Sequence, residues 1–256
     1  MSLTFEERKK TILDWLDKDE KVQVLPLAEQ LSVTTETIRR DLDRLEKEGR
    51  LKKVYGGAVR TRENVMEPPF MKRSLMQPDE KAAIGAFAAS LVQEGETVMI
   101  DNGTTTLEVL KALRDRADVT VVTHSVPVLL YAMEMFKGQL IFVGGQMDVQ
   151  AQAATGAMTE NSLQQFKVHK AFISVGGVSL KDGISDYNVN EASISRCMMA
   201  RAEESIVVAD HTKLGQSAFA KIADIKQVSM LITDRGCSAD WAKQWRETGN
   251  EIYITE

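Results

Sequence analysis

Six consecutive residues in the middle of the chain have the chemical types needed to hold an anion: Asp101, Asn102, Gly103, Thr104, Thr105 and Thr106. They follow an apolar run typical of a buried strand and precede a helical pattern, so we expect them to join a strand to a helix. Gly103 would let the backbone turn tightly, and three hydroxyls and several N–H groups would then surround the start of the helix. That arrangement favours phosphate, although threonines also cap helices in loops that hold no ligand.

Further polar residues and glycines follow other predicted strands. They are Thr123-His124-Ser125, Gly144-Gly145, Gly176-Gly177, and Asp210 to Lys213 with Gly215. Any one glycine pair could simply end a strand. Their shared position is more informative, because ligands of parallel sheets bind at the carboxyl ends of the strands. We therefore expect several loops to form one site at this edge of the sheet.

A second group of candidate functional residues is basic. Residues 33–62 carry nine lysines and arginines against five acidic residues, a local charge of +4, whereas the whole chain has a net charge of −5. Because salt screens charges beyond roughly 8–10 Å, a basic patch on an acidic protein still attracts phosphates. On charge alone, a solvated charged helix is the alternative.

Three helical patterns position these basic residues. The predicted helices cover residues 6–17, 27–31 and 35–48. Pro26 suits the first turn of the second helix, and Gly49 is suited to end the third. Two short helices joined by a tight turn after a supporting helix indicate a helix-turn-helix.

In such a motif the second helix enters the major groove with its N-terminal residues facing the base edges. Here those residues are Thr34, Thr35, Thr37, Arg39 and Arg40. Threonine can contact bases or phosphates, and arginine can grip guanine or phosphate with two donors. Residues 51–60 resemble a β-hairpin that would add a wing, with Lys52 and Lys53 on the DNA backbone.

Beyond residue 78, strand and helix patterns alternate. The strand-like runs are 97–101, 119–123, 140–143, 171–175, 205–209, 228–233 and 251–255, and the helical runs are 81–92, 104–114, 126–136, 159–166, 191–202 and 238–246. This alternation indicates an α/β domain with a mostly parallel sheet covered on both faces. The proline-containing segment 61–77 predicts a linker. The expected parts are therefore a DNA-binding domain at 1–60, a linker at 61–77 and an α/β domain at 78–256.

Composition excludes several other classes of protein. Hydrophobic residues make up 43% and charged residues 27%, as in ordinary globular proteins. No apolar run reaches the roughly 18 residues of a membrane helix, and the first residues lack the order of a signal peptide. The two cysteines and three histidines are scattered without metal or redox spacing. We therefore expect no metal, cofactor or membrane partner, and a cytoplasmic location.

Many of these residues match one family at fixed spacing. In the N-terminal part they are Arg8, Ile12, Leu16, Thr34, Thr37-Ile38-Arg39-Arg40-Asp41-Leu42 and the wing-like Tyr55-Gly56-Gly57-Ala58. In the remainder they are Asp101 to Thr106, Val121-Val122-Thr123, Gly144-Gly145, Lys170-Ala171-Phe172, Gly176-Gly177, Asp182-Gly183, Glu191-Ala192, Asp210 with Lys213 and Gly215, and Ile232-Thr233-Asp234. Together they resemble the DeoR family of bacterial transcriptional regulators over nearly the whole chain. His124 departs from the pattern, because the family usually has asparagine there, and a larger ring that can carry charge would alter the ligand's shape or the pH response.

The resemblance implies a winged helix-turn-helix domain and an α/β domain with the fold of ribose-5-phosphate isomerase. It implies that this α/β domain binds a phosphorylated sugar effector. It implies that Asp101, Gly103 to Thr106 and Lys213 hold phosphate or hydroxyl groups, and that Asp182 and Glu191 face the sugar. An ordinary surface ion pair is the alternative for Lys213 and Glu191. The expected effector-binding residues are Asp101, Gly103, Thr104, Thr105, Thr106, Thr123, His124, Gly144, Gly145, Gly176, Asp182, Glu191 and Lys213. The expected DNA-binding residues are Thr34, Thr35, Thr37, Arg39, Arg40, Lys52, Lys53, Tyr55 and Gly56.

These expectations together predict a transcriptional repressor of a carbohydrate-metabolism operon, which a phosphorylated sugar releases from double-stranded operator DNA. Transcriptional activation is the alternative to repression in this family. A homodimer or homotetramer would match paired half-sites. The competing hypothesis is a sugar-phosphate isomerase with an appended DNA-binding domain, in which Glu191 or Asp182 would be the base. Since no convincing acid–base pair accompanies them, we expect no enzyme activity. A protein-interaction module would leave the clustered basic residues unexplained.

Overall fold

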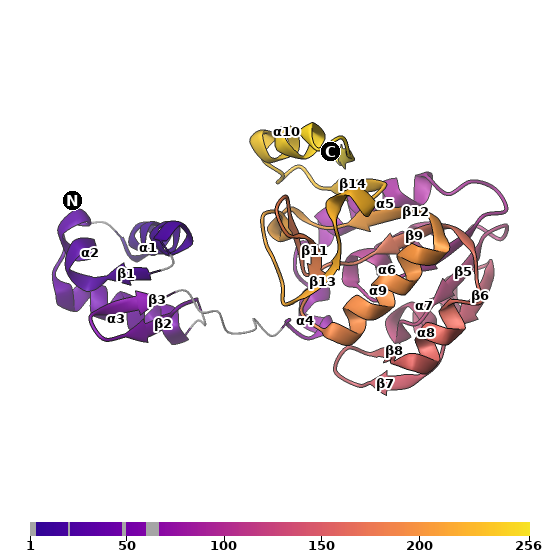
Figure 1. The fold of residues 1–256 in the computed structure, drawn as a ribbon, viewed down its shortest axis with the longest axis horizontal. Helices are drawn as coiled ribbons and strands as arrows, with labels where there is room; N and C mark the ends of the chain where they lie inside the picture. The colour runs from indigo at the N-terminus through magenta and orange to yellow at the C-terminus, as the bar shows by residue number, and fades with distance from the viewer. Residues whose placement is uncertain (1–3, 20, 48–49, 60–66) are drawn as a thin grey trace. The chain divides into compact units, whose positions relative to one another are not determined.

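The computed structural model describes residues 4–19, 21–47, 50–59 and 67–256. They form two compact units, one within residues 1–65 and one within residues 66–256 (Figure 1). No helix among the described residues has the length and apolar character needed to cross a membrane. The predicted helix end at Gly49 and the linker residues 61–66 lie outside the described part of the chain.

The smaller unit is a winged helix-turn-helix. Its elements are α1 (Phe5–Asp19), β1 (Lys21–Gln23), α2 (Val24–Gln30), α3 (Thr35–Lys47), β2 (Lys52–Val54) and β3 (Gly57–Val59). The three strands form an antiparallel sheet in the order β1-β3-β2. The predicted wing hairpin is therefore joined by β1, which is too short to give a periodic signal. Helix α2 begins at Val24, before the predicted start, and Pro26 lies in its first turn.

The core of the smaller unit comes from all three helices and the wing. As the spacing predicts, Ile38, Leu42 and Leu45 on α3 are fully buried, and Ile12 on α1 packs with them. The same two helices are joined by an ion pair in which the Arg8 guanidinium donates to both carboxylate oxygens of Asp41. The Nε–Oδ2 distance is 2.6 Å and the Nη2–Oδ1 distance is 3.0 Å. This two-point contact fixes the recognition helix against its support.

The larger unit contains a seven-stranded parallel sheet in the order β15-β14-β12-β9-β4-β5-β6. Its strands are β4 (Thr97–Ile100), β5 (Thr120–Thr123), β6 (Gln139–Phe142), β9 (Val168–Ile173), β12 (Ala202–Val208), β14 (Met230–Thr233) and β15 (Glu251–Ile254). Each coincides with one of the seven predicted runs. The fold class expected from the sequence is therefore confirmed.

Helices and two small sheets surround this central sheet. The helices are α4 (Phe70–Ser74), α5 (Pro78–Ser90), α6 (Thr104–Leu113), α7 (Val126–Met135), α8 (Ala157–Leu163), α9 (Val189–Arg201) and α10 (Ala239–Glu247), with short 3-10 turns at His211–Lys213 and Ile225–Gln227. The small sheets pair β7 (Gln146–Asp148) with β8 (Ala153–Thr155), and β10 (Gly177–Ser179) with β11 (Gly183–Asp186) and β13 (Ala220–Ala223). The sequence analysis does not anticipate these five short strands.

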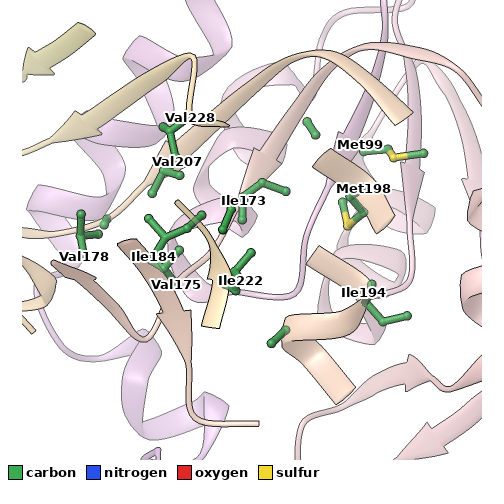
Figure 2. Close-up of a cluster of buried hydrophobic side chains, with 14 of the residues drawn as sticks. Met99, Ile173, Val175, Val178, Ile184, Ile194, Met198, Val207, Ile222 and Val228 are labelled. Atoms are coloured by element: carbon green, nitrogen blue, oxygen red, sulfur yellow. The ribbon is translucent and has the colours of Figure 1, made fainter. Parts of the chain in front are cut away.

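The central sheet buries alternate residues on opposite faces. In β12, Ile206 and Val208 pack into a cluster with α5, α6 and α7, whereas Val207 belongs to the cluster on the other face. Figure 2 shows part of that second cluster, formed by residues of the sheet, α9 and the small sheet: Met99, Ile173, Val207, Ile194, Met198, Ile184 and Ile222. Covering both faces explains why these strands are apolar throughout.

The strand order places a switch point between β4 and β9. From β4 the sheet grows through β5 to β6, and from β9 it grows the other way through β12 to β15. The chain after β4 enters α6, which packs on one face, while the chain after β9 leads to α9, which packs on the other. Connections that diverge in this way open a crevice at the carboxyl ends of the two strands, where ligands bind in such sheets.

Part of the expected linker is ordered within the larger unit. Residues 67–77 contain α4, which packs against α6. The prolines that indicated a linker stand at helix starts instead, since Pro69 precedes α4 and Pro78 opens α5. The segment therefore forms one wall of the larger unit.

We expect Asp41→Asn to destabilise the smaller unit by about 2 kcal/mol, because it removes the carboxylate that Arg8 contacts at two points. Hydrogen exchange of the α1 and α3 amides would measure the loss. Asp43→Asn is the matched control on the same helix, because Asp43 is exposed and its pair with Lys53 is solvated, so its cost should stay below about 1 kcal/mol. Equal protection in the two variants would contradict a structural role for the Arg8–Asp41 pair.

Candidate functional site

The start of α3 carries the expected DNA-binding threonines. Thr34 caps the helix, since its hydroxyl accepts a hydrogen bond from the Thr37 N–H at 3.2 Å and lies 2.9 Å from the Thr37 hydroxyl. Thr35 begins the helix and is half-buried. The capping bond fixes the first turn, which is the part that faces base edges in a helix-turn-helix.

The expected basic residues differ in how freely they reach solvent. The Arg39 and Arg40 side chains are 58% and 80% exposed, with only long contacts to Glu36 at 3.6 and 3.8 Å. Lys53 is more constrained, because its ammonium pairs with Asp43 and its N–H donates to Glu46. These two contacts hold the wing against α3, and they leave Arg39 and Arg40 as the more accessible cations.

A surface groove runs between the start of α3, β1 and the wing. Among the residues that line it are Thr35, Arg39, Lys53, Tyr55 and Gly56. Tyr55 is fully exposed at the wing tip, where Gly56 adopts a positive φ of 80° that favours glycine. Of the other predicted residues, Lys52 is exposed on β2. The arrangement offers cations and an aromatic ring on one surface, which suits a phosphate backbone.

In the larger unit, the buried carboxylate of Asp101 organises the crevice at the switch point. Its Oδ1 accepts from the Asn102 N–H at 2.8 Å and lies 3.0 Å from His124 Nε2. Its Oδ2 accepts from the Ser174 N–H at 3.2 Å and from the Ser195 hydroxyl at 2.8 Å. Both oxygens are thus occupied by protein groups from four segments of the chain.

His124 is fully buried beside this carboxylate. Its Nδ1 lies 2.8 Å from the Ala154 carbonyl oxygen, and its Nε2 faces Asp101. Each ring nitrogen thus lies within hydrogen-bond distance of an oxygen atom. The His124 ring, which stands where the family usually has asparagine, therefore lies at the floor of the crevice. Thr123 lies there too, with its hydroxyl donating to the Ile100 carbonyl at 2.7 Å.

Gly103 is required by close packing. Its backbone is extended, and a Cβ at this position would lie 2.2 Å from the Ser174 hydroxyl oxygen. The loop after β4 therefore contacts the loop after β9. This contact, and not the tight turn expected from the sequence, is the reason that position 103 is glycine. Thr106 secures the loop by donating its hydroxyl to the Asp101 carbonyl at 2.7 Å.

A pocket of about 540 Å³, including its open mouth, lies over this crevice. Its walls come from the start of α6, the loops after β9 and β12, and the segment around α4. The lining residues are Glu67, Pro68, Arg73, Met76, Gln77, Lys81, Thr104, Thr105, Ser174, Val175, Val208, Ala209, Asp210, Thr212 and Lys213. The predicted residues Thr104, Thr105 and Lys213 are thus brought together.

The pocket is cationic at the start of α6. Lys81 is buried, and burial together with the nearby charges of Lys213 and Arg73 lowers its pKa, against the opposite effect of Asp210. Lys213 lies 5.4 Å from the centre of the Tyr187 ring, a cation–π contact. That ring in turn packs on Gly176, where a Cβ would approach it to 2.9 Å. Gly176 therefore helps to position Lys213.

Two buried carboxyl groups, Asp186 and Glu191, lie outside the pocket lining but near enough for the charge of Asp186 to act on Glu191. Desolvation, followed by the nearby charges of Asp186, Glu67 and Asp101, raises the pKa of Glu191 to about 8 against the hydrogen bond from Asn102. Desolvation likewise raises the pKa of Asp186 to about 7. Glu191 Oε1 accepts from Asn102 Nδ2 at 2.7 Å. Glu191 is therefore mostly protonated at neutral pH.

Three predicted effector residues lie elsewhere. Asp182 is exposed at the turn between β10 and β11, where it accepts from the Ser217 hydroxyl at 2.7 Å. Gly144 is exposed, and a Cβ on Gly145 would lie 2.0 Å from the Thr159 hydroxyl oxygen. None of the three lines the pocket. Packing against α8 explains Gly145, whereas a Cβ on Gly144 would meet no atom within 4 Å.

The comparison with family models covers both units. Residues 8–64 match the DeoR-like helix-turn-helix domain, and residues 76–235 match the DeoR C-terminal sensor domain. The chain belongs to the DeoR family. It is accordingly a transcriptional regulator with a DNA-binding domain and a sensor domain.

Individual DeoR-family relatives extend over nearly the whole chain. The uncharacterized HTH-type transcriptional regulator YulB of Bacillus subtilis (strain 168) is 34% identical over 90% of this chain and 89% of its own length. The HTH-type transcriptional repressor GlcR of the same organism is 30% identical over 98% of this chain and 96% of its own. A solved structure of ribose 5-phosphate isomerase A from Methanocaldococcus jannaschii is 18% identical, covers 54% of each chain and gives a TM-score of 0.41.

Sequence reasoning missed several pocket residues of this DeoR-family sensor domain. Arg73 and Lys81 lie in or next to the segment read as a linker, and Ser174 precedes the glycine pair that drew attention. Asp186, which does not line the pocket, was also missed; it lies four residues beyond Asp182 on the same hairpin. Pro69 and Pro78 at helix starts were the available signal for an ordered segment.

The raised pKa of Glu191 predicts a pH-dependent stability. The folded state holds this proton more tightly than an ordinary carboxyl of pKa 4.5, so the stabilisation is complete below about pH 4.5 and is lost as pH rises through about 8. Glu191→Gln keeps the oxygen that accepts from Asn102 but cannot ionise. We expect its melting temperature to exceed that of the natural chain by a few degrees at pH 9 and by little at pH 5.

Thermal unfolding from pH 5 to 9 would measure this difference. Glu94→Gln, at an exposed carboxyl, is the matched control and should follow the natural chain throughout. Parallel curves for Glu191→Gln and the natural chain would show that Glu191 does not carry a buried proton.

Proposed function

We propose that this DeoR-family regulator represses a carbohydrate-metabolism operon and leaves its operator when the larger unit binds a phosphorylated sugar. The observation that carries the proposal is the pocket at the switch point, where the start of α6 meets the side chains of Arg73, Lys81 and Lys213.

The start of α6 would bind the phosphate. Among the described residues, the hydroxyls of Thr104 and Thr105 and the N–H groups of the first turn make no hydrogen bond, although both threonines are largely buried. Such groups are donors directed at a ligand, and the helix dipole favours negative charge there. Lys213 adds a full positive charge at the same place.

The sugar hydroxyls would extend toward Asn102, Asp186 and Glu191. A protonated carboxyl both donates and accepts hydrogen bonds, so the raised pKa values of these two acids suit neutral hydroxyl groups. Asp101 and His124 would act as a scaffold beneath the ligand, since both oxygens of Asp101 are already bonded. Asp186 takes the role expected of Asp182, which lies at an exposed turn.

Operator binding would use α3 and the wing. Arg39 and Arg40 are the most accessible cations near the start of the recognition helix, and Tyr55 with Lys52 would contact the backbone from the wing. A homodimer or homotetramer in the cytoplasm would present two readers to paired half-sites. A ligand that binds the DNA-incompetent arrangement more tightly would then release the operator.

The protonation of Glu191 favours sensing over isomerase chemistry. A base must be ionised to take a proton from carbon, but a buried carboxyl with a pKa of about 8 is mostly protonated at neutral pH. Its oxygen is also engaged by the Asn102 amide. We therefore propose a regulator without catalytic activity, and isomerisation of any bound sugar phosphate would overturn this part.

Arg39→Ala and Arg40→Ala should each weaken operator binding more than about tenfold and reduce its salt dependence, because each removes a contact to a base or phosphate. DNA fragments selected from genomic DNA by the purified protein would serve in a binding titration. Arg246→Ala on α10 is an exposed control that should bind as the natural chain does. Unchanged affinity in both α3 variants would remove α3 as the reader.

A thermal-shift panel of sugar phosphates and their unphosphorylated parents would test the sensor. We expect one phosphorylated sugar, but not its parent, to raise the melting temperature by several degrees. Lys213→Ala and Thr105→Val should reduce this shift and retain DNA binding, because they remove a charge and a hydroxyl from the pocket. Lys226→Ala, at an exposed lysine outside the pocket lining, is the control. A full shift in both pocket variants would exclude these residues from the site.

A further inference from the structure

The segment before α5 contributes an internal ion pair to the wall of the pocket. Arg73 Nη1 lies 2.8 Å from Glu67 Oε1, and the two side chains are only 12% and 16% exposed. Arg73 Nε also donates to the Pro68 carbonyl at 3.0 Å. Both Arg73 and Glu67 line the pocket. The Arg73 guanidinium therefore faces the space for a ligand, and it is paired there with the Glu67 carboxylate of its own segment.

The charges that line the pocket suggest what else could occupy that guanidinium. The cations are Arg73, Lys81 and Lys213, and the acids are Glu67 and Asp210. Asp210 is committed to the turn that follows it, where it accepts from the Thr212 N–H at 3.0 Å. Without Glu67, three cations would face one carboxylate, a net charge of +2. A phosphate monoester carries about −1.5 to −2 at neutral pH, so it would balance this charge.

Lys81 connects the ion pair to the rest of the pocket. Its ammonium donates to the Arg73 carbonyl at 2.6 Å, so the backbone that carries Arg73 is tied to α5. The charges of Lys213 and Arg73 both act on Lys81. The three cations thus form one cluster, in which an anion held by Lys213 would also attract Arg73.

We propose that Arg73 is a binding residue for the effector's phosphate, and that the ligand displaces Glu67 as the partner of Arg73. This inference rests on the proposed function, since it deepens the role of the same pocket. Glu67 would then lose its partner in the segment that contains α4.

Inorganic phosphate is a suitable probe, because it tests the anion site without knowledge of the sugar. Titration calorimetry at pH 7.5 with the full chain would compare the natural protein with Glu67→Gln, Arg73→Gln and the double variant. Glu67→Gln removes the competing charge, so phosphate should bind about tenfold more tightly. Arg73→Gln should weaken binding by about tenfold or more. The double variant should bind phosphate much more weakly than Glu67→Gln does, because it lacks the guanidinium that the phosphate would gain.

Asp115→Asn is the matched control for net charge. It removes one exposed carboxylate that pairs with Lys137 outside the pocket lining, and should change phosphate affinity less than twofold.

The outcomes separate this inference from the proposed function. If Lys213→Ala and Thr105→Val weaken phosphate binding while Glu67→Gln and Arg73→Gln leave it unchanged, the pocket binds phosphate but the exchange at Arg73 is wrong. If Glu67→Gln weakens binding, the carboxylate assists the ligand and the proposed competition is overturned. If phosphate binds neither the natural chain nor Glu67→Gln, both this inference and the proposed anion site are wrong.

Discussion

The buried carboxylate of Asp101 is the contact on which the sensor unit depends. It accepts hydrogen bonds from the loop after β4, the loop after β9 and helix α9, and it pairs with the ring that follows β5. A buried polar group costs free energy unless it is hydrogen-bonded, and both oxygens of Asp101 are. The four segments that meet there are the ones that diverge at the switch point, so one residue holds the crevice together.

The site has two parts: a floor whose polar groups are bonded within the protein, and an upper part whose polar groups can still bond a ligand. The floor comprises Asp101, His124, Thr123 and Thr106, whose polar groups are all bonded to protein atoms. The hydroxyls at the start of α6, the basic side chains and the two acids with raised pKa values retain hydrogen-bonding capacity. A ligand therefore meets donors that are already oriented and loses little free energy in ordering them.

Much of the fold could be predicted because apolar runs that alternate with helical patterns give a clear signal. All seven strands of the central sheet and the three helices of the smaller unit follow from such patterns. The three-residue strands β7, β8 and β10 are too short to give one. In the site, the loop of Thr104 and Thr105 was found from its residue types. Arg73 was not, because Pro69 beside it suggests a linker until its position at a helix start is known. Asp182 and Asp186 differ only by their places along one hairpin, which the sequence does not specify.

The position of β4 inside the sheet affects the order in which the protein can form during synthesis. The first strand of the sensor unit pairs with β9, and Asp101 gains its last bond from Ser195. About two thirds of the unit, residues 66 to 195, must therefore leave the ribosome before the crevice can be completed, whereas the contacts of the winged helix-turn-helix all lie within the first 65 residues. Since domains fold as units from the N-terminus, a nascent chain has its DNA reader before it has the means to be controlled.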